Sequence, residues 1–176
     1  EQVWGVRATG AGSVVKAKDG DKNIKVDYSY RLIIPVYHKG KLVTYQGRDW
    51  TGKVSPKYKA AHPSVEAAPI KDILYGLDKA EGIDTGVLVE GVTDVWRIGI
   101  GGIACFGIKY REPQVRLLIE HFKALKILFD TEPQAKIQAL KIIKALVPYL
   151  PVDWIKLPKG KDPADLTQEE IKELLR

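Results

Sequence analysis

One short stretch, residues 87–94 with the sequence VLVEGVTD, constrains the fold of this chain more than any other. Three apolar residues lead into Glu90 and a glycine follows at once, which predicts a buried parallel strand that ends there and a helix from Val92. In an open parallel sheet, residues just past the carboxyl end of a strand face the ligand crevice. Glu90 is therefore a candidate functional residue, although the motif alone is equally typical of an ordinary strand-to-helix turn.

A second stretch, residues 125–133 with the sequence LKILFDTEP, repeats this arrangement. A strand-like run leads into two carboxylates, Asp130 and Glu132, and Pro133 suits the first turn of a helix. Two strands of one parallel sheet that both end in acidic residues would bring three carboxylates together. The repetition therefore favours a functional interpretation of Glu90 over the ordinary turn.

The positive charge of the chain is concentrated in its first part. The 176 residues, 45% of them hydrophobic, suit one domain or a domain with a smaller attached lobe. Residues 1–80 hold 14 Lys and Arg against 8 Asp and Glu, whereas residues 81–176 hold 14 of each kind. A basic lobe beside an acidic crevice suggests a polyanion bound next to a metal site, although the same excess also suits a solvated surface.

Several protein classes are excluded by what the sequence lacks. The single cysteine, Cys105, excludes an intramolecular disulfide and a cysteine-rich zinc module, and its apolar neighbours predict that it is buried. No apolar run reaches the length of a membrane span and no signal peptide is visible, so we expect no membrane partner. The chain holds no Met, even at position 1, so we expect that it derives from something longer.

Residues 1–69 are predicted to form a basic, β-rich lobe. Residues 30–37, YRLIIPVY, and residues 42–49, LVTYQGRD, are strand-like and are separated by a tight turn, which predicts a hairpin. Pro35 would interrupt a central ladder, so we expect an edge or a bulge there. Residues 51–69 show little periodicity and several prolines, and are expected to form a loop or linker.

The rest of the chain predicts an α/β fold. Apolar residues at helical spacing predict a connecting helix over residues 70–84, and strands and helices then alternate over residues 85–176. The expected strands are 87–90, 102–106, 125–130 and 152–156, and the expected helices are 92–98, 113–123, 133–146 and 167–175. This alternation predicts a parallel sheet flanked by helices, and Thr167 followed by Glu170 predicts a capping box at the last helix.

Four segments in this order resemble one family. The acidic residues at 90–94 and 130–132, with the β/α rhythm between them, resemble the Toprim domain of bacterial-type primases, type IA and II topoisomerases and several nucleases. Residues 74–80, LYGLDKA, resemble the segment that joins the two lobes of bacterial and phage DNA primases. Residues 47–48 with 56–58 resemble the basic contact segment of their first lobe, and residues 159–166, KGKDPADL, resemble the run that closes their Toprim region. Nearly the whole chain thus resembles the RNA-polymerase catalytic core of DnaG-type primases.

This resemblance implies a nucleotidyltransferase that makes short RNA primers from ribonucleoside triphosphates on single-stranded DNA, in the bacterial cytoplasm. It implies Mg²⁺ or Mn²⁺ as cofactor, and a Toprim-like sheet preceded by a smaller β-rich lobe. A replicative helicase and a zinc-binding module outside this segment are the expected partners. The usual Asp-x-Asp pair is here Asp130-Thr131-Glu132. Because of this and other differences, the chain resembles phage or plasmid primases more than the cellular enzyme.

The resemblance also implies roles for the acidic residues. Mg²⁺ is commonly held by a few carboxylates while substrate phosphates and water complete its shell, and Glu90, Asp130 and Glu132 fit that role. Glu90 is also a candidate acceptor for the proton of the attacking hydroxyl. Asp162 and Asp165 are weaker candidates for metal binding. For Asp94, one helical turn beyond Glu90, capping of the helix and support of the metal ligands are equally compatible with the sequence.

Three basic residues are the best candidates for contacts with template or nucleotide phosphates, namely Arg48, Lys57 and Lys71. Tyr58 is a candidate for stacking on bases. The four tryptophans, Trp4, Trp50, Trp96 and Trp154, are expected to be packing residues. Any single lysine is also compatible with a solvated surface.

Two other functions remain open at this stage. A Toprim nuclease would use the same carboxylates for hydrolysis, and the altered acidic pair also allows a non-catalytic nucleic-acid-binding module. The basic first lobe favours the primase. A topoisomerase is less compatible with the chain, because its cleavage tyrosine and gate domains need more residues.

Overall fold

The computed structural model describes residues 3–107, 109–158, 161 and 163–176. The chain divides into a first unit, Glu1–Ile70, and a second unit, Lys71–Arg176. Within the described ranges, no helix has the length and apolar character needed to cross a bilayer.

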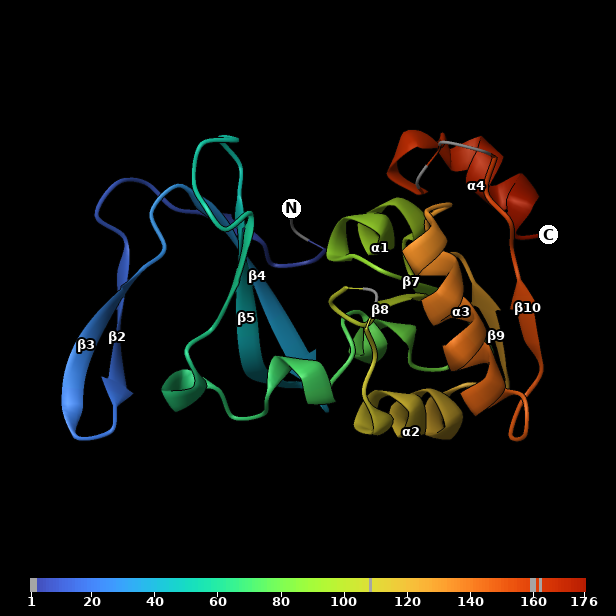
Figure 1. Ribbon diagram of the computed structural model, residues 1–176, viewed down its shortest axis with the longest axis horizontal. Helices are drawn as coiled ribbons and strands as arrows, with labels where there is room; N and C mark the ends of the chain where they lie inside the picture. Colours follow the sequence, from blue (N-terminus) through green and yellow to red (C-terminus); the bar gives the residue numbers. More distant parts are fainter. Residues whose placement is uncertain (1–2, 108, 159–160, 162) are drawn as a thin grey trace. The chain divides into compact units, whose positions relative to one another are not determined.

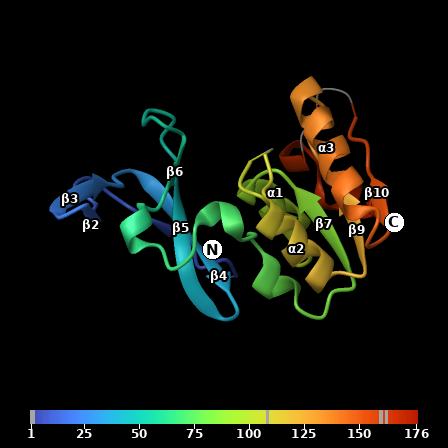
Figure 2. The ribbon, with the colours of Figure 1, turned by 60° about the horizontal axis from the view of Figure 1, so that its bottom comes forward.

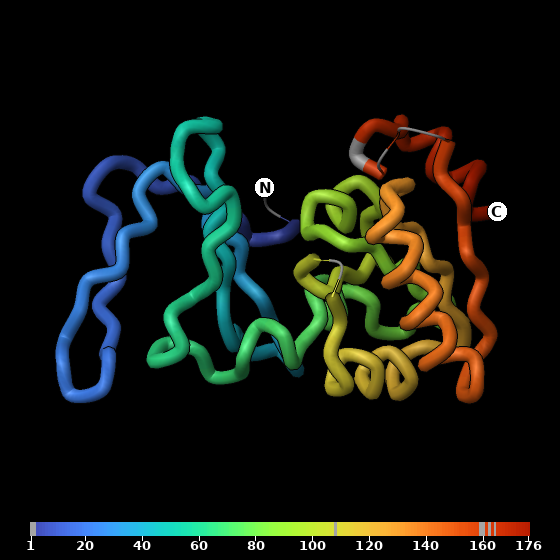
Figure 3. Tube along the Cα trace, viewed as in Figure 1, coloured from blue at the N-terminus to red at the C-terminus, as the bar shows by residue number. Residues whose placement is uncertain are grey.

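Antiparallel strands build the first unit (Figure 1). They are β1 (Arg7–Ala8), β2 (Val14–Asp19), β3 (Lys22–Asp27), β4 (Arg31–His38), β5 (Lys41–Asp49) and β6 (Tyr58–Ala60), followed by the 3-10 turn η1 (Pro63–Val65). One sheet has the order β1-β4-β5-β6, and β2 pairs with β3 in a separate hairpin whose path can be followed in Figure 3. This confirms the predicted β-rich first lobe.

The hairpin of β4 and β5 shows the irregularity expected near Pro35. The two strands pair from Arg31 opposite Asp49 to His38 opposite Lys41, and their register shifts between Val36 and Tyr37. Strand β1 pairs only with Leu32 and Ile33 of β4. Pro35 therefore lies beyond that ladder, where a residue without a backbone N–H is tolerated.

A buried arginine organises the core of the first unit. Arg31 is 2% exposed, and its Nη1 donates to Pro56 O at 2.8 Å, with longer contacts to Gly47 O and Lys57 O at 3.5 Å. The buried Tyr28 donates its hydroxyl to Ala60 O at 2.6 Å. The Arg31 bonds tie the loop after β5 to β4, and the Tyr28 bond holds the end of β6. Loss of the partner of such a buried donor would cost about 1–3 kcal/mol.

A parallel four-stranded sheet with flanking helices forms the second unit (Figure 2). Its strands, in the order β10-β9-β7-β8, are β7 (Thr85–Val89), β8 (Gly102–Ala104), β9 (Ala124–Ile127) and β10 (Val152–Trp154). Its helices are α1 (Val92–Ile98), α2 (Glu112–His121), α3 (Pro133–Leu146) and α4 (Gln168–Leu174), with 3-10 turns η2 (Ile70–Asp72), η3 (Leu77–Ala80) and η4 (Pro163–Asp165). The predicted α/β sheet is confirmed.

Helices bury both faces of this sheet. Leu88, Ile103 and Ile127 of the strands join one apolar cluster with Leu118 of α2 and Ile142 of α3. Val87 and Val89, which alternate with Leu88 and so point to the opposite face, are also buried, and α1 contacts β7 and β8. Burial on both faces explains why β7 reads as a continuous apolar run.

The single helix predicted over residues 70–84 is wrong. Two short 3-10 turns, η2 and η3, replace it, and between them Tyr75 pairs with Ala104 in an antiparallel bridge with N···O distances of 3.0 and 3.1 Å. Gly76 has a positive φ of 86°, which an α-helix does not allow. Apolar residues do recur at helical spacing in this segment, but the segment forms a bridge to β8 and not an α-helix.

Other element bounds differ less from the prediction. Helices α1 and α3 match the predicted ranges, whereas β8, β9 and β10 end two or three residues before the predicted ends. The predicted capping box of α4 is present, with Glu170 N donating to Thr167 Oγ1 at 3.2 Å and Thr167 N donating to Glu170 Oε2 at 2.7 Å.

Candidate active site at the carboxyl ends of the parallel strands

Two acidic residues, Glu90 and Asp130, meet just past the ends of neighbouring strands. In the parallel pair β7 and β9, Leu88 lies opposite Ile127, and the N–H of Leu128 extends the pairing by donating to Leu88 O at 2.9 Å. The backbone N–H of Asp130 then donates to Glu90 Oε1 at 3.0 Å. The parallel register therefore brings the ends of the two predicted acidic motifs together.

Asp94 closes the first turn of α1 beside this pair. Its Oδ2 accepts a hydrogen bond from Gly91 N at 3.0 Å, and its side chain is buried. A Cβ on Gly91 would lie 3.1 Å from Asp94 Oδ2, so a glycine suits this tight approach. The sequence allows Asp94 either to cap the helix or to support the metal ligands, and the structure shows it capping α1.

The environment of Glu90 disfavours its negative charge. Burial first, and then the negative charges of Asp130, Asp94 and Glu132, raise the pKa of Glu90 to about 7, while the hydrogen bond from Asp130 N acts in the opposite direction. Several carboxylates near a half-buried glutamate therefore create a region of negative potential. A cation bound there would relieve this repulsion.

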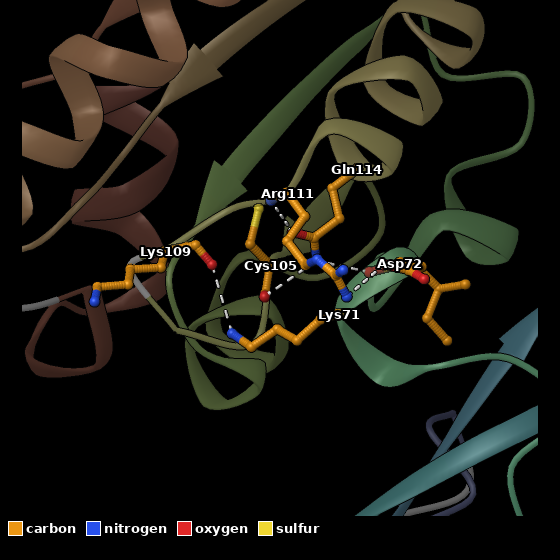
Figure 4. Close-up of polar contacts among 7 residues, drawn as sticks. Lys71, Asp72, Cys105, Lys109, Arg111 and Gln114 are labelled. Atoms are coloured by element: carbon orange, nitrogen blue, oxygen red, sulfur yellow. Dashed lines mark hydrogen bonds and ion pairs between the residues drawn. The ribbon is translucent and has the colours of Figure 1, made fainter. Parts of the chain in front are cut away.

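The segment after β8 contacts Glu90 through the backbone and is held by Lys71. Gly107 N donates to Glu90 O at 2.8 Å, and Phe106 and Gly107 both have positive φ, 60° and 108°. The Nζ of Lys71 donates to Phe106 O at 2.6 Å. It also donates to Lys109 O at 3.5 Å (Figure 4). Burial lowers the pKa of Lys71. Lys71, predicted as a phosphate contact, thus has its ammonium turned toward backbone carbonyls of this segment.

Gln114 anchors the same segment from α2. Its Nε2 donates to Ile73 O at 2.9 Å and to Cys105 O at 3.2 Å, and its Oε1 accepts from Arg111 N at 3.0 Å (Figure 4). Arg111 also forms an ion pair with Asp72 at 2.9 Å. Cys105 is buried, as predicted, and burial raises the pKa of its thiol to about 12, so it is an inert packing residue.

The remaining predicted acidic residues are less closely gathered. Glu132 precedes α3 at its N-cap position and is exposed, and Asp165 is exposed at the end of η4. Asp162 lies outside the described residues. In the part of the chain that the structure covers, no three His, Cys, Asp or Glu side chains are grouped so as to hold a metal ion by themselves. The convergence of three carboxylates stays a prediction, and the contact present between two of these residues is the hydrogen bond from Asp130 N to Glu90 Oε1.

This pair fits an open Mg²⁺ site better than a closed one. Mg²⁺ usually keeps several waters and binds through one or two carboxylates plus substrate phosphates rather than an all-protein cage. Glu90 and Asp130 supply hard oxygen ligands in a region of negative potential. The donor set is therefore suited to a hydrated ion whose shell the substrate completes.

The basic candidates of the first unit gather around one aromatic ring. Arg48 of β5 lies opposite Tyr58 of β6, with its Cζ 5.6 Å from the centre of the Tyr58 ring. The Nζ of Lys57 lies 5.9 Å from the same ring. The Tyr58 ring is thus flanked by cations, an arrangement typical of surfaces that bind nucleic-acid strands.

Sequence reasoning missed a cavity on the other side of Asp130. Trp154 and Lys156, at and after the end of β10, line it together with Lys136 in the first turn of α3. The sequence assigned Trp154 to packing and gave the two lysines no role. Their position near the carboxyl end of a predicted parallel strand was the available signal. Trp50, also predicted to pack, is 54% exposed, so that prediction is wrong.

Known proteins resemble this chain in both sequence and structure. No protein-family model matches the chain. A DNA primase of Clostridium acetobutylicum is 28% identical over 172 residues, which cover 93% of this chain and 28% of that protein. The chain therefore spans much less than the full length of this relative.

Two solved primase structures share the fold. The zinc-binding and RNA-polymerase domains of the Aquifex aeolicus primase match 98% of this chain and 50% of that one, with a TM-score of 0.82 and 21% identity. A DnaG primase catalytic domain bound to single-stranded DNA matches 92% of this chain and 55% of that one, with a TM-score of 0.75 and 22% identity. The chain thus resembles a DNA primase in sequence and shares the fold of the two primase structures.

Proposed function

We propose that this chain is the catalytic core of a DNA primase, which makes short RNA primers from ribonucleoside triphosphates on a single-stranded DNA template. The observation that carries the proposal is the Glu90–Asp130 pair at the ends of adjacent parallel strands. The shared fold supports the choice of enzyme, and the DNA-bound primase among the similar structures supports the choice of template. A phage or plasmid type, a helicase and a separate zinc-binding module remain predictions from the sequence.

In this reaction the 3′-hydroxyl of one nucleotide attacks the α-phosphorus of the next, and pyrophosphate leaves. Glu90 and Asp130 are the residues that would hold a divalent cation, with Glu132 at the exposed start of α3 as a further ligand. When bound, such an ion neutralises the triphosphate and favours ionisation of the hydroxyl. Glu90 is also a candidate acceptor of the hydroxyl proton. Asp94 holds the backbone N–H of the next residue, Gly91, and Lys71 holds the carbonyl of Phe106, in the segment whose Gly107 N donates to Glu90 O.

Primer extension tests this proposal directly. The chain, a primed single-stranded template, Mg²⁺ or Mn²⁺ and labelled ribonucleoside triphosphates should give extended RNA. Glu90→Gln and Asp130→Asn should each abolish extension, while Glu120→Gln, an exposed change on α2, should not. Mn²⁺ binding measured by calorimetry should weaken in the first two variants and persist in the third. Extension by Asp130→Asn at the parental rate would show that the catalytic assignment is wrong.

Initiation should be separable from extension. One Cys and three His in the whole sequence cannot build a zinc-binding module of the kind expected to read a start site. The chain should therefore extend a primer weakly but start a new primer at a preferred sequence only when such a module is added. Degradation of single-stranded DNA without any incorporation of nucleotides would instead favour the nuclease.

A further inference from the structure

An apolar hollow of about 770 Å³ lies on one face of the four-stranded sheet of the first unit. Its walls come from the segment 5–9, which includes β1, and from Ile33, Pro35 and Tyr37 of β4 with Leu42 of β5. Side chains two residues apart on a strand share a face, so the three β4 residues point into the hollow from the same side of the sheet. The alternate residues Ile34 and Val36 are buried on the opposite face.

The face that carries the hollow leaves large apolar side chains exposed. Tyr37 and Leu42 lie opposite each other in the β4–β5 ladder and are 44% and 56% exposed. An antiparallel sheet that packs on one face usually carries polar side chains on the other. Contiguous exposed apolar patches mark interaction sites, whereas scattered single residues are ordinary. This face is therefore a candidate contact surface.

The hollow is bounded by an open strand edge. Strand β1 is the outermost strand in the order β1-β4-β5-β6. Thr9 fixes it to β4, because the N–H and the hydroxyl of Thr9 donate to Arg31 O at 2.8 and 2.9 Å. Residues of an antiparallel ladder alternate in the side to which their N–H and C=O point, so those of Ala8 point away from β4. Such outward groups on an edge can pair with another extended chain.

The charged residues around the hollow are basic. Arg7 is the charged residue of its lining, is exposed, and takes no part in the ion pairs between described residues. Lys39 and Lys41, in and after the β4–β5 turn next to Leu42, are also exposed. This charge favours an acidic partner. A second copy of the chain would place these cations near their own counterparts, and a DNA strand would not match the apolar lining.

We propose that this surface binds an extended, acidic segment of a partner protein. The segment would add a strand to β1 through hydrogen bonds to the N–H and C=O of Ala8. Apolar side chains at alternate positions would enter the hollow over Pro35 and Tyr37, and carboxylates would lie near Arg7. In this mode of recognition the main-chain bonds give affinity and the side-chain pockets give specificity. The inference does not depend on the proposed function, because it uses no residue of the candidate active site.

Fluorescence anisotropy with a labelled synthetic peptide tests the proposal. The probe is a peptide of about eight residues, the length of a long strand, in which glutamate and valine alternate. A peptide with lysine in place of each glutamate is its control. The parent protein should bind the glutamate peptide and not the lysine peptide. Equal binding of the two peptides, or binding of neither, would overturn the proposal.

Two pairs of variants locate the binding surface. Arg7→Gln should weaken binding of the glutamate peptide by about twofold to fivefold, the range of an exposed ion pair, and Leu42→Gln should also weaken it. The controls are Lys25→Gln, which removes the same charge from an exposed position of β3, and Val14→Gln, which replaces an exposed apolar residue of β2. Both controls should bind the peptide like the parent. Equal losses in a variant and its control would show that this surface is not the site.

Addition of a strand to β1 has its own test. Ala8→Pro removes the outward N–H without removing a hydrogen bond to β4, and a proline is tolerated at such an edge position. It should weaken peptide binding by about twofold to tenfold, the range of one hydrogen bond, while keeping the thermal melt of the parent. In the parent, hydrogen exchange of the Ala8 amide should slow when the peptide binds. Unchanged exchange at Ala8 would contradict strand addition, whether or not Ala8→Pro folds.

The other occupants of the surface give different results. If a single-stranded oligonucleotide displaces the peptide and loses affinity in both Arg7→Gln and Leu42→Gln, the surface binds DNA and the proposal is wrong. If the parent dimerises in sedimentation and Leu42→Gln abolishes the dimer, the surface joins two copies and the proposal is again wrong. Loss of primer extension by the parent would count against the proposed function and leave this inference standing.

Discussion

Gly47 occupies a position in β5 where no side chain fits. A Cβ at this residue would lie 2.9 Å from Cδ of Arg31 and 3.0 Å from Cδ1 of Tyr28, and both of these side chains are buried. The missing side chain lets Arg31 reach the carbonyls of the following loop. In the Gly47-Arg48 motif, Gly47 is thus required by the packing of the core, and Arg48 is the basic residue next to Tyr58.

Gly47→Ala should therefore destabilise the first unit. Overpacking of a filled core costs about 1–3 kcal/mol, and relief here requires a shift of Arg31 or Tyr28. Chemical denaturation of the variant and the parent measures the loss. Gly10→Ala is the control, because a Cβ at Gly10 meets no atom within 4 Å. Equal stability of the two variants would contradict the packing role.

Asp49 makes the stability of the first unit depend on pH. Burial alone would raise the pKa of Asp49, but hydrogen bonds from Val54 N at 3.0 Å and from Thr51 N and Oγ1 at 2.8 Å outweigh it and lower the pKa. Because the pKa of Asp49 is lower in the folded protein than in the unfolded chain, its ionised carboxylate stabilises the folded state. This stabilisation is complete above pH 3.8, the ordinary pKa of an aspartate, and is lost as the pH falls through the pKa of Asp49 in the folded protein.

Asp49→Asn should accordingly lower the melting temperature at pH 7 and have a smaller effect near pH 3. The parent loses the carboxylate contribution in acid, so parent and variant should converge there. Thermal melts at both pH values measure this, with Asp21→Asn in an exposed turn as control. A gap between parent and Asp49→Asn that stays the same at both pH values would show that the carboxylate charge is not the cause.

At the scale of elements, α2 is tied to the rest of the second unit by one buried amide. Gln114 satisfies the carbonyls of Ile73 and Cys105 and the N–H of Arg111, and its side chain is fully buried. Gln114→Leu keeps the size of the side chain but leaves three backbone groups without this partner. Since each unpaired buried group costs about 1–3 kcal/mol, the variant should lose several kcal/mol in denaturant unfolding.

The exposed change Gln134→Leu, in the first turn of α3, is the control for Gln114→Leu. It makes the same substitution without removing a buried hydrogen bond. A similar loss of stability in both variants would mean that helix propensity or surface polarity, and not the amide network, determines the result.

The elements themselves were predictable where an apolar pattern coincides with a local signal for the start of a helix, such as Pro133 or Thr167. Helices α1 and α3 and the capping box at Thr167 follow from local sequence. The region from Ile70 to Ala80 carries an apolar spacing of 3 to 4 residues, yet it forms a bridge to β8. This pairing joins residues that are far apart in the chain, so no local sequence pattern predicts it.

At the scale of the whole molecule, the excess of positive charge and the candidate metal ligands lie in different parts of the chain. Residues 1–80 hold the entire charge excess, 14 Lys and Arg against 8 Asp and Glu, whereas the candidate metal ligands lie in the second unit. Binding of single-stranded DNA through phosphates should therefore weaken with salt, with a slope of log K against log[salt] of about −0.7 per phosphate neutralised.

Fluorescence anisotropy over a series of salt concentrations measures this slope. Arg48→Ala should make the slope shallower and should weaken binding to unrelated DNA sequences alike, while Asp130→Asn should leave DNA binding nearly unchanged. Binding that does not respond to salt, or an effect of Arg48→Ala on one sequence only, would contradict a phosphate contact.

The candidate site was predictable in outline because it depends on topology. Once Glu90 and Asp130 are placed after parallel strands, adjacency of the strands brings them together. The cavity beside them was not predictable, because it depends on how far the side chains of Trp154, Lys136 and Lys156 lie from their neighbours in three dimensions. The inward turn of the Lys71 ammonium depends in the same way on the path of the segment after β8.

The contact of Gly76 with β8 has a further consequence. A Cβ at Gly76 would overlap the carbonyl oxygen of Gly102, and its φ of 86° already disfavours other residues. We expect replacements at position 76 to be selected against as sequences of this kind diverge, because a side chain there would push β8 away from the Tyr75 bridge. The partly exposed Arg111–Asp72 pair is free to change. Among distant descendants of a common ancestor, this glycine should therefore outlast most of the charged residues around it.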